Sequence, residues 1–379
     1  MKTAAILFEN NSFKKEFNND NLDFADCELV LGFGSRDLLA DEKIFAQLRN
    51  RFPSSELVLC SSAGEIYENE VLDNTISLTA IKFSSTQVKT CEVNIADFEN
   101  SFEAGSSLIR KFSQNHLKLV LILSDGGKVN GSELANGMNS VKEERVLIAG
   151  GLAGDGARFE KTLVGLNKMP EQGKIIAIGF YGEKLLVSHG SLGGWESFGL
   201  ERLVTKAEGN VLYEIDGRNV LDLYKIYLGK YAEELPGSAL LFPLSIKIDG
   251  TDEPIVRTIL SIDEKNQTMT FAGDVPTGSR VRFMKANFDR LIDAASEAAL
   301  SCLEVNSFKP KLALLISCVG RKLILGSRID EEVEAVAEIF GNTAIAGFYS
   351  YGEISPLKPF GNCILHNQTM TVTCINEMN

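Results

Sequence analysis

Apolar and polar positions along the chain alternate in a way that predicts short buried strands separated by amphipathic helices. One unit recurs: an apolar strand, a Ser/Gly turn, a helix, a second strand, a loop of glycine and an acid, and a returning strand. Its first strands lie at 29–31, 119–123 and 312–316. Because strands and helices alternate, we predict an α/β fold of two lobes of mixed β-sheet with flanking helices, built from repeated strand-helix-strand-strand units.

The glycine of the acid-bearing loop follows the second strand in each unit, at Gly64, Gly154 and Gly352. Ligands of α/β proteins bind in the crevice beyond the carboxyl ends of strands. Glycine also lets the backbone come close to a ligand. We therefore expect a small ligand near these loops, and we expect the segments 150–156 and 347–353 to move when it binds.

A middle section, 200–290, departs from this pattern. It is predicted to consist of strands and a helix at 220–228, with a hairpin whose turn is the polar tetrapeptide Asp-Glu-Lys-Asn at 263–266. We predict an N-terminal domain at 1–195 and a C-terminal, ligand-sensing domain at 196–379. The section 200–290 then connects the two domains or is inserted between their elements.

Composition narrows the classes of function. The chain has 51 acidic and 38 basic side chains and a formal net charge of −13, so nucleic acid and anionic membranes are not expected as direct partners. No apolar run approaches the roughly 20 residues that span a bilayer, and the N-terminus lacks the apolar stretch of a secretion signal. The seven cysteines are widely spaced and include no Cys-x-x-Cys pair, which argues against disulfides and structural zinc. We therefore expect a cytoplasmic protein.

Cys318 is one candidate for chemistry. It follows a predicted strand and precedes Gly320 and Arg321, whose guanidinium could lower the pKa of the thiol. The repeat places Glu353 and His366 nearby, so a thiol-dependent hydrolase is one hypothesis. The alternative is that Cys318 is a small buried core residue. Arg321, at the end of a strand, is expected either to pair with a ligand carboxylate or to form a structural ion pair.

His366 and His189 are candidates for a second kind of chemistry. His366 is flanked by apolar strand residues, which is typical of a buried core or edge histidine, and His189 is followed by Gly190, which would relieve crowding by a macrocycle. The alternative is an axial ligand to haem iron, since that role needs only one imidazole and an apolar slot. His366 is the first choice for the metal and His189 the second. Only three histidines are present, so a site built from several of them is not expected.

Several segments together resemble one known family. Cys-Ser-Ser-Ala-Gly-Glu-Ile at 60–66 and Gly-Gly-Leu-Ala-Gly-Asp at 150–155 are similar to motifs of the FIST sensory proteins, which have an N-terminal and a C-terminal FIST domain. Further similar segments follow in the family's order, at 207–217, 271–276, 317–321, 347–354 and 366–370. The resemblance spans about residues 25 to 375.

The resemblance implies a cytoplasmic input module of signal transduction that is not an enzyme. The implied ligand is an amino-acid-like metabolite or, as in the nitric-oxide-sensing subgroup, haem. The implied partner is a separate histidine kinase, as in a two-component system, or a cyclic-di-GMP enzyme, that is, a diguanylate cyclase or phosphodiesterase. A ligand-free interaction scaffold and the Cys318 hydrolase are the alternatives, and assembly into a homo-oligomer stays open.

The resemblance also implies which residues bind haem or the ligand. Haem ligation falls to His366 as the metal ligand, while His189, the second choice, lies outside these motifs. Ligand binding falls to Gly154, Asp155, Cys318, Gly320, Arg321, Tyr351, Gly352, Glu353 and Asn367.

Overall fold

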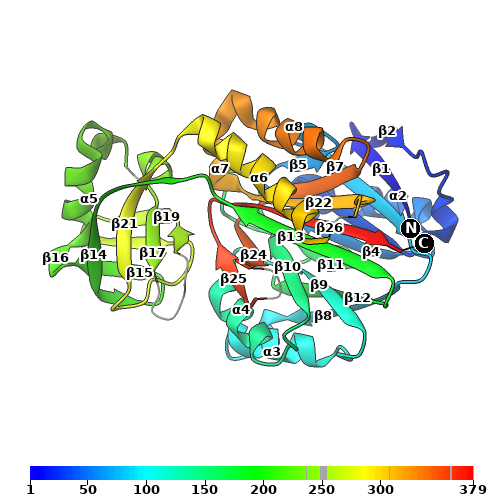
Figure 1. Ribbon diagram of the computed structural model, residues 1–379, viewed down its shortest axis with the longest axis horizontal. Helices are drawn as coiled ribbons and strands as arrows, with labels where there is room; N and C mark the ends of the chain where they lie inside the picture. The colour runs from blue at the N-terminus through cyan, green and yellow to red at the C-terminus, as the bar shows by residue number, and fades with distance from the viewer. Residues whose placement is uncertain (236, 248–253, 307, 359–360, 379) are drawn as a thin grey trace.

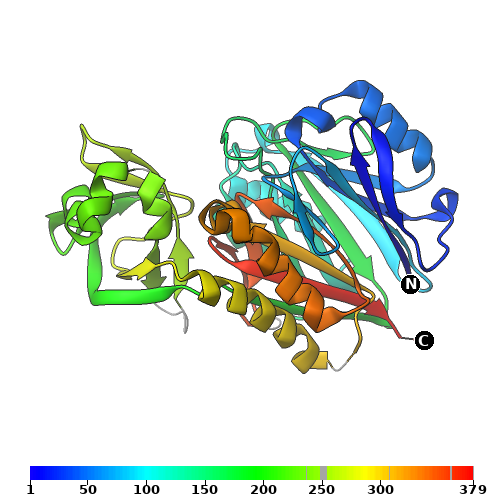
Figure 2. The same cartoon turned by 90° about the horizontal axis from the view of Figure 1, so that it is seen from above.

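The computed structural model describes residues 1–235, 237–247, 254–306, 308–358 and 361–378. The chain forms a large body, which contains both termini, and a small lobe that projects from one end of it (Figures 1 and 2). The small lobe comprises residues 196–285, and two short connectors, 193–195 and 286–287, join it to the body. It overlaps the section 200–290 that departs from the repeat.

The body contains three copies of one unit, in which two parallel strands are joined by a helix and an antiparallel strand returns beside the first. The parallel pairs are β3 (Leu29–Gly34) with β4 (Glu56–Ser61), β9 (Leu117–Ser124) with β10 (Leu147–Leu152), and β22 (Leu312–Cys318) with β23 (Ala344–Ser350). The return strands are β7 (Ile76–Lys82), β12 (Lys174–Tyr181) and β26 (Met370–Glu377). The connecting helices are α2 (Glu42–Arg51), α4 (Gly131–Asn139) and α8 (Ile329–Phe340). The predicted α/β class and its repeated units are confirmed.

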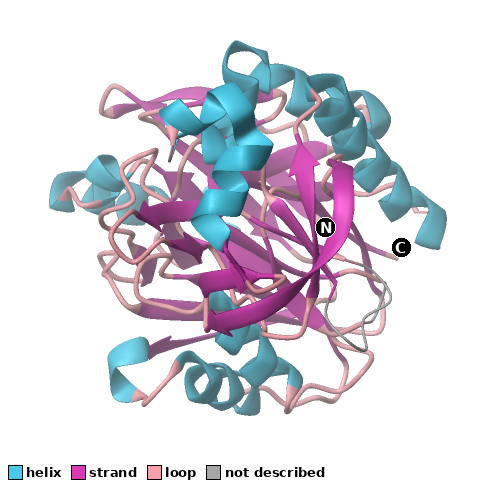
Figure 3. Ribbon diagram, turned by 90° about the vertical axis from the view of Figure 1, so that its left-hand side faces the viewer, coloured by secondary structure: helices cyan, strands magenta, loops and turns pink. Residues whose placement is uncertain are grey.

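Each repeat also has an outer strand beside its return strand, which the sequence pattern did not reveal. These outer strands are β1 (Lys2–Glu9), β8 (Gln87–Asn94) and β13 (Leu185–Leu192). Strand β2 (Ser12–Phe17) extends the first sheet beyond β1. Helices α3 (Ser101–Arg110) and α6 (Phe288–Asn306) precede the first strands of the second and third repeats, and α1 (Arg36–Leu39) and α7 (Val319–Leu325) follow the first strands of the first and third. Helices lie mainly at the rim of the strand-rich centre (Figure 3).

Three short strands exchange between the repeats and tie the sheets into a ring. Each follows a Gly-acid loop and pairs with a strand of a different repeat: β5 (Glu65–Tyr67) with β23, β11 (Val164–Leu166) with β4, and β24 (Gly352–Pro356) with β10. Strands β6 (Glu70–Leu72) and β25 (Cys363–His366) then pair with β5 and β24. The Gly154 amide donates to the Ser61 carbonyl at 2.9 Å, and the Tyr351 amide to the Leu152 carbonyl at 3.0 Å. The loops therefore meet at one end of the body.

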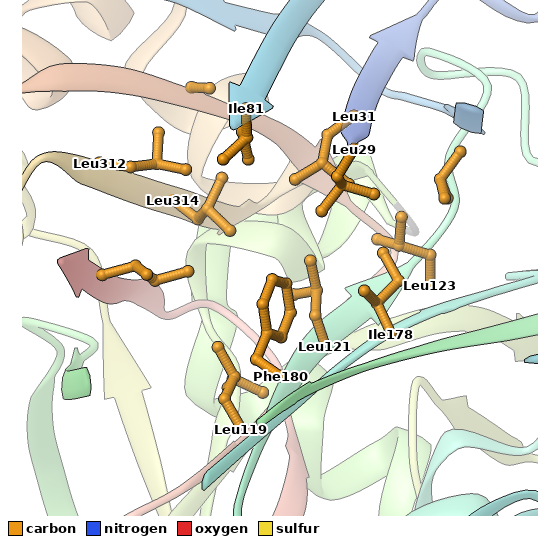
Figure 4. Packing of buried hydrophobic residues seen from close by; sticks show 14 of the residues in the cluster. Leu29, Leu31, Ile81, Leu119, Leu121, Leu123, Ile178, Phe180, Leu312 and Leu314 are labelled. Carbon is orange, nitrogen blue, oxygen red and sulfur yellow. The ribbon is translucent and has the colours of Figure 1, made fainter. Parts of the chain in front are cut away.

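Alternate residues of the first strands fill one core that all three sheets share. Successive side chains of a strand point to opposite faces, so every second residue can face this core. The buried residues are Leu29 and Leu31 from the first repeat, Leu119, Leu121 and Leu123 from the second, and Leu312 and Leu314 from the third (Figure 4). Burying one such side chain stabilises a fold by roughly 1.5–3 kcal/mol, so the shared core holds the repeats together.

The small lobe has its own sheet and its own apolar core. Its strands lie in the order β18-β17-β21-β14-β15-β20-β19, with β16 (Arg218–Asn219) paired to β15. Their bounds are β14 (Glu196–Glu208), β15 (Val211–Ile215), β17 (Leu244–Lys247), β18 (Ile255–Arg257), β19 (Ile259–Asp263), β20 (Thr268–Phe271) and β21 (Arg280–Lys285). Helix α5 (Val220–Leu228) occupies the predicted residues, because Asn219 caps its first turn and Gly229, with φ of 56°, ends it.

Within the described residues, no helix is both long and apolar enough to cross a membrane.

Candidate ligand-binding site

A pocket of about 310 Å³ lies between the body and the small lobe, and we call it the interlobe pocket. The body contributes the turn 126–131 after β9, together with Leu152, Phe159 and Tyr351. The small lobe contributes Asn210, Leu260 and the segment 271–274. The pocket thus lies beyond the carboxyl ends of β9 and β10, where α/β sheets bind ligands.

The turn after β9 brings Lys128 to the pocket. The buried Asp125 carboxylate accepts hydrogen bonds from the Gly127 and Lys128 amides at 2.7 Å each and from the Gly173 amide at 2.8 Å. This folds the turn tightly, and Asn130 then begins α4 by accepting from the amides of its first turn. The Lys128 side chain is exposed and has no ion-pair partner in the part of the chain that the structure describes.

Asp274 and Arg257 join the small lobe to the body beside the pocket. The Asn130 side-chain amide donates to the Asp274 carboxylate at 3.3 Å, and the Asp274 amide donates to the Ser132 hydroxyl at 3.4 Å. The Arg257 guanidinium, which is buried, donates to the Asp274 carbonyl and to the Leu365 carbonyl of the body. Burial lowers the pKa of Arg257 to about 10, so it stays charged at neutral pH. These hydrogen bonds join the two lobes beside the interlobe pocket.

Two stacked rings form the aromatic wall of the pocket. The rings of Tyr351 and Phe159 have centroids 4.6 Å apart and an interplanar angle of 19°. The Tyr351 hydroxyl donates a short hydrogen bond to Asp155, and the Phe159 amide donates to the same carboxylate at 2.9 Å. Asp155 is fully buried and is paired with Arg36 at 2.9 Å. Burial, followed by the bond to Asp155, raises the pKa of Tyr351, so the phenol is neutral.

Arg321 lies in a different environment from the one that the sequence predicted. It is not in a loop at the end of a strand but in α7, which begins directly after Cys318. Its side chain is fully buried and forms an ion pair with Glu332 at 2.6 Å. Its remaining donors bond the Gly193 and Leu291 carbonyls, at 2.6 Å each. Every guanidinium nitrogen therefore has a partner inside the protein, as in a structural ion pair.

Cys318 is a buried thiol rather than an activated one. Its side chain is 3% exposed, and burial, reinforced by Glu353, raises its pKa well above the ordinary value; the opposing effect of Arg321 is smaller. The neighbouring guanidinium does oppose this rise, but desolvation dominates, and Cys318 matches the alternative of a small buried core residue. Gly320 packs directly against the Gln368 side chain, which leaves no room there for a substrate.

Glu353 and Asn367 also lie inside the third repeat. Glu353 accepts hydrogen bonds from the Ser350 hydroxyl at 2.7 Å and the Thr369 hydroxyl at 2.8 Å. Burial raises the pKa of Glu353 to about 8, so this carboxyl is largely protonated at neutral pH. The Asn367 side-chain amide donates to the His366 carbonyl at 2.9 Å. Both side chains are fully buried and do not line the interlobe pocket.

The two histidines are buried among strands. His366 Nε2 lies 2.9 Å from the Ser355 carbonyl oxygen, and His189 Nδ1 lies 3.0 Å from the Thr373 hydroxyl. Burial lowers the pKa of His366 to about 4 and that of His189 to about 3, so both rings are neutral. Neither lines the interlobe pocket. Haem ligation stays a prediction to which this geometry lends no support.

Among the described residues, no three His, Cys, Asp or Glu side chains are grouped to hold a metal ion.

The structure therefore divides the predicted site residues into two groups. Tyr351 lines the interlobe pocket, and Asp155 accepts a hydrogen bond from its hydroxyl. Gly154 and Gly352 lie in close contact with neighbouring segments, where a side chain would not fit. The second group lies in the interior of the third repeat and comprises Cys318, Gly320, Arg321, Glu353, Asn367, His366 and His189. Their part in ligand binding stays a prediction.

Sequence reasoning missed most of the pocket lining. Lys128, Asn130 and Phe159 from the body, and Asn210 and Asp274 from the small lobe, all line it. A signal was present in the Ser-Asp-Gly-Gly turn at 124–127, which has the same place in its repeat as the other strand-end turns.

Comparisons with known proteins give the family. The FIST N domain matches residues 28–218, and the FIST C domain matches residues 221–356. An uncharacterized protein of Mycobacterium tuberculosis is 22% identical over 342 residues, which cover 87% of this chain and 86% of that protein. An uncharacterized protein of Methanocaldococcus jannaschii is 26% identical over 226 residues, which cover 54% of this chain and 42% of that protein.

Among solved structures, a cyanuric acid hydrolase from A. caulinodans aligns with a TM-score of 0.38 and 8% identity, over 95% of this chain and 92% of the hydrolase. A likeness at that level says nothing about the chemistry of this chain. The two domain matches, in contrast, together span most of its length, and the chain belongs to the FIST family.

Proposed function

We propose that this protein is a sensor that binds a small ligand in the interlobe pocket and signals by a change in the position of the small lobe. FIST domains are generally sensory domains of signal transduction and are typically non-catalytic. The observation that carries the proposal is that the two walls of the pocket belong to two lobes joined by only two short connectors. A ligand that contacts both walls binds one arrangement of the lobes better than another, and this difference produces a signal.

The lining suits a small molecule with charged and apolar parts. Lys128 offers an unpaired ammonium group, and Asp274, Asn130 and Asn210 offer groups that donate or accept hydrogen bonds. The aromatic wall and Leu260 offer apolar surface. Small-molecule sites commonly combine an apolar lining with a few convergent polar groups. An amino-acid-like metabolite, with its carboxylate toward Lys128, has this chemistry.

We further propose that the output passes to a separate enzyme of signalling. The family resemblance implies a histidine kinase or a cyclic-di-GMP enzyme as the partner. A kinase candidate is checked by its autophosphorylation rate in the presence of the ligand-free and the ligand-bound protein. The buried, high-pKa thiol of Cys318 supports a sensor over a thiol hydrolase.

A thermal-shift screen of the twenty amino acids and related small acids tests the proposal. A ligand that binds the native state at 100 times its Kd stabilises it by about 2.7 kcal/mol and therefore raises the Tm. The shift should shrink in Lys128→Ala but persist in Lys43→Ala, which removes an exposed lysine on α2, far from the pocket. A screen in which no compound raises the Tm would favour the ligand-free scaffold instead.

A further inference from the structure

Phe159 has an unusual backbone for an aromatic residue. Its φ is 55°, in the left-handed region that favours glycine, and its side chain is 52% exposed. Such a conformation is strained for a residue with a side chain and persists only where the surroundings impose it. Here the Phe159 amide donates both to the Asp155 carboxylate and to the Tyr351 hydroxyl, at 2.9 and 3.1 Å. The body thus holds a largely exposed ring in a fixed place.

Only one face of the Phe159 ring is covered by another ring. Tyr351 stacks on that face almost in parallel, and no second aromatic ring contacts Phe159 among the described residues. Phe159 lines the interlobe pocket together with Phe271 from the small lobe. The hydrogen bonds of its amide account for the backbone of Phe159, while its half-exposed side chain, stacked on one face only, leaves ring surface available to a ligand in the pocket.

A positive charge also lies at the interlobe pocket. Lys128 lies on the turn that lines the same cavity, and its ammonium group has no carboxylate partner in the described chain. A cavity of about 310 Å³ has room for one ring system with a short polar group. Asn130 and Asn210 at its wall are held in place by bonds to Asp274 and to the Phe271 carbonyl, which leaves Lys128 as the unpaired polar side chain of the lining that the inference uses.

We infer that the ligand of the interlobe pocket is an aromatic carboxylate whose ring stacks on Phe159 and whose carboxylate pairs with Lys128. This inference rests on the proposed function, because it concerns the ligand of the same pocket. It narrows that proposal from any amino-acid-like metabolite to one with a planar ring. The stacked pair Phe159 and Tyr351 then serves as a preformed platform, so that little order is lost when the ligand binds.

Isothermal titration of the full chain with matched probes tests the inference. Phenylacetate and indole-3-acetate carry the ring, cyclohexanecarboxylate has a similar size without a π-face, and alanine represents ligands without a ring. The aromatic acids should bind about three- to tenfold more tightly than cyclohexanecarboxylate, as expected for one stacking contact. Phe159→Ala should remove that preference, whereas Phe102→Ala, an exposed phenylalanine on α3, should keep it.

The outcomes separate the two proposals. Equal affinity for phenylacetate and cyclohexanecarboxylate, or unchanged phenylacetate affinity in Phe159→Ala, would overturn the ring inference while leaving a ligand-binding pocket in place. Binding of alanine as tight as that of phenylacetate would do the same. If none of the four probes and none of the amino acids binds, both the ring inference and the proposed function are wrong.

Discussion

Asp155 and Glu353 occupy matching positions in the second and third repeats, each directly after the glycine of its loop. Neither side chain is exposed to solvent. Asp155 is paired with Arg36 and also accepts from the phenol of Tyr351. Glu353 has only hydroxyl and amide donors, and burial raises its pKa to about 8. One position in the fold therefore holds a charged carboxylate in one copy and a largely neutral carboxyl in the other.

The matching acid of the first repeat, Glu65, has the same kind of environment as Glu353. Glu65 accepts from the hydroxyls of Ser62 and Thr75, as Glu353 accepts from Ser350 and Thr369, and burial raises its pKa to about 7. Two copies thus use the acid to hold their loop to their own return strand. The second copy differs where it meets the small lobe, and this divergence marks the interlobe pocket as the specialised part of the body.

The strongest test of the structural role of the third repeat is Arg321→Met. It would leave Glu332 buried without its cation, and removing one partner of a buried ion pair destabilises a protein by about 3–5 kcal/mol. Urea unfolding measures this loss. Arg328→Met is the matched control, because its ion pairs with Asp289 and Glu331 are exposed to solvent, which screens them, so their loss should have a much smaller effect. A similar small cost for both variants would contradict the structural assignment of Arg321.

A direct comparison of the two acids gives the next largest effect. Asp155→Asn should cost about 1–3 kcal/mol at pH 7, because it removes the charge that pairs with Arg36 and bonds three amides of the following loop. Glu353→Gln should cost less than about 1 kcal/mol, since the carboxyl that it replaces is already largely neutral. Urea unfolding of the two variants at pH 7 measures both costs. Equal losses in the free energy of unfolding would show that the environments of Asp155 and Glu353 do not differ as described.

The dependence of stability on pH gives the finest distinction. In the unfolded chain Glu353 loses its proton near its ordinary pKa of 4.5, whereas in the folded protein it keeps the proton to about pH 8. The folded state binds more protons between these values, so the stabilisation due to this neutral carboxyl is complete below pH 4.5 and is lost as the pH rises toward 8. Urea unfolding between pH 5 and 8 should show a shallower decline in Glu353→Gln than in the wild type. An unchanged slope would mean that Glu353 is ionised in the fold.

Much of the body was predictable from periodicity. The strands at the centre of each sheet are short apolar runs, and the buried side chains of the connecting helix α8 recur at helical spacing. The outer strand β8 was missed because it lies at an edge of its sheet and most of its residues are partly exposed, which weakens its pattern. Arg321 was placed in a loop because the glycine before it suggested a turn, whereas α7 includes that glycine.

The interlobe pocket was not predictable from local patterns. Its walls come from the turn 126–131 and the segment 271–274, which are far apart in the sequence and meet only because the small lobe docks on the body. The docking contacts combine hydrogen bonds, such as those of Asp274 with Asn130 and Ser132, with packing of Leu357 and Ile364 on the core of the small lobe, and no periodic motif encodes them. Phe159 gave no signal either, because its role depends on a backbone conformation that residue type does not reveal.

Arg321 bonds the chain at two points that lie 98 positions apart in the sequence and next to each other in space: Gly193 just before the small lobe, and Leu291 in the first turns of α6 just after it. The Arg321 guanidinium therefore links the chain entering the small lobe to the chain leaving it. Trp195 adds a second fastening, since its indole donates to the Gln368 carbonyl at 3.0 Å. The proposed movement of the small lobe would pivot here and would reach the body through α6, which packs on α8 and β13. Because Trp195 is the sole tryptophan of the chain, its fluorescence emission should report that movement.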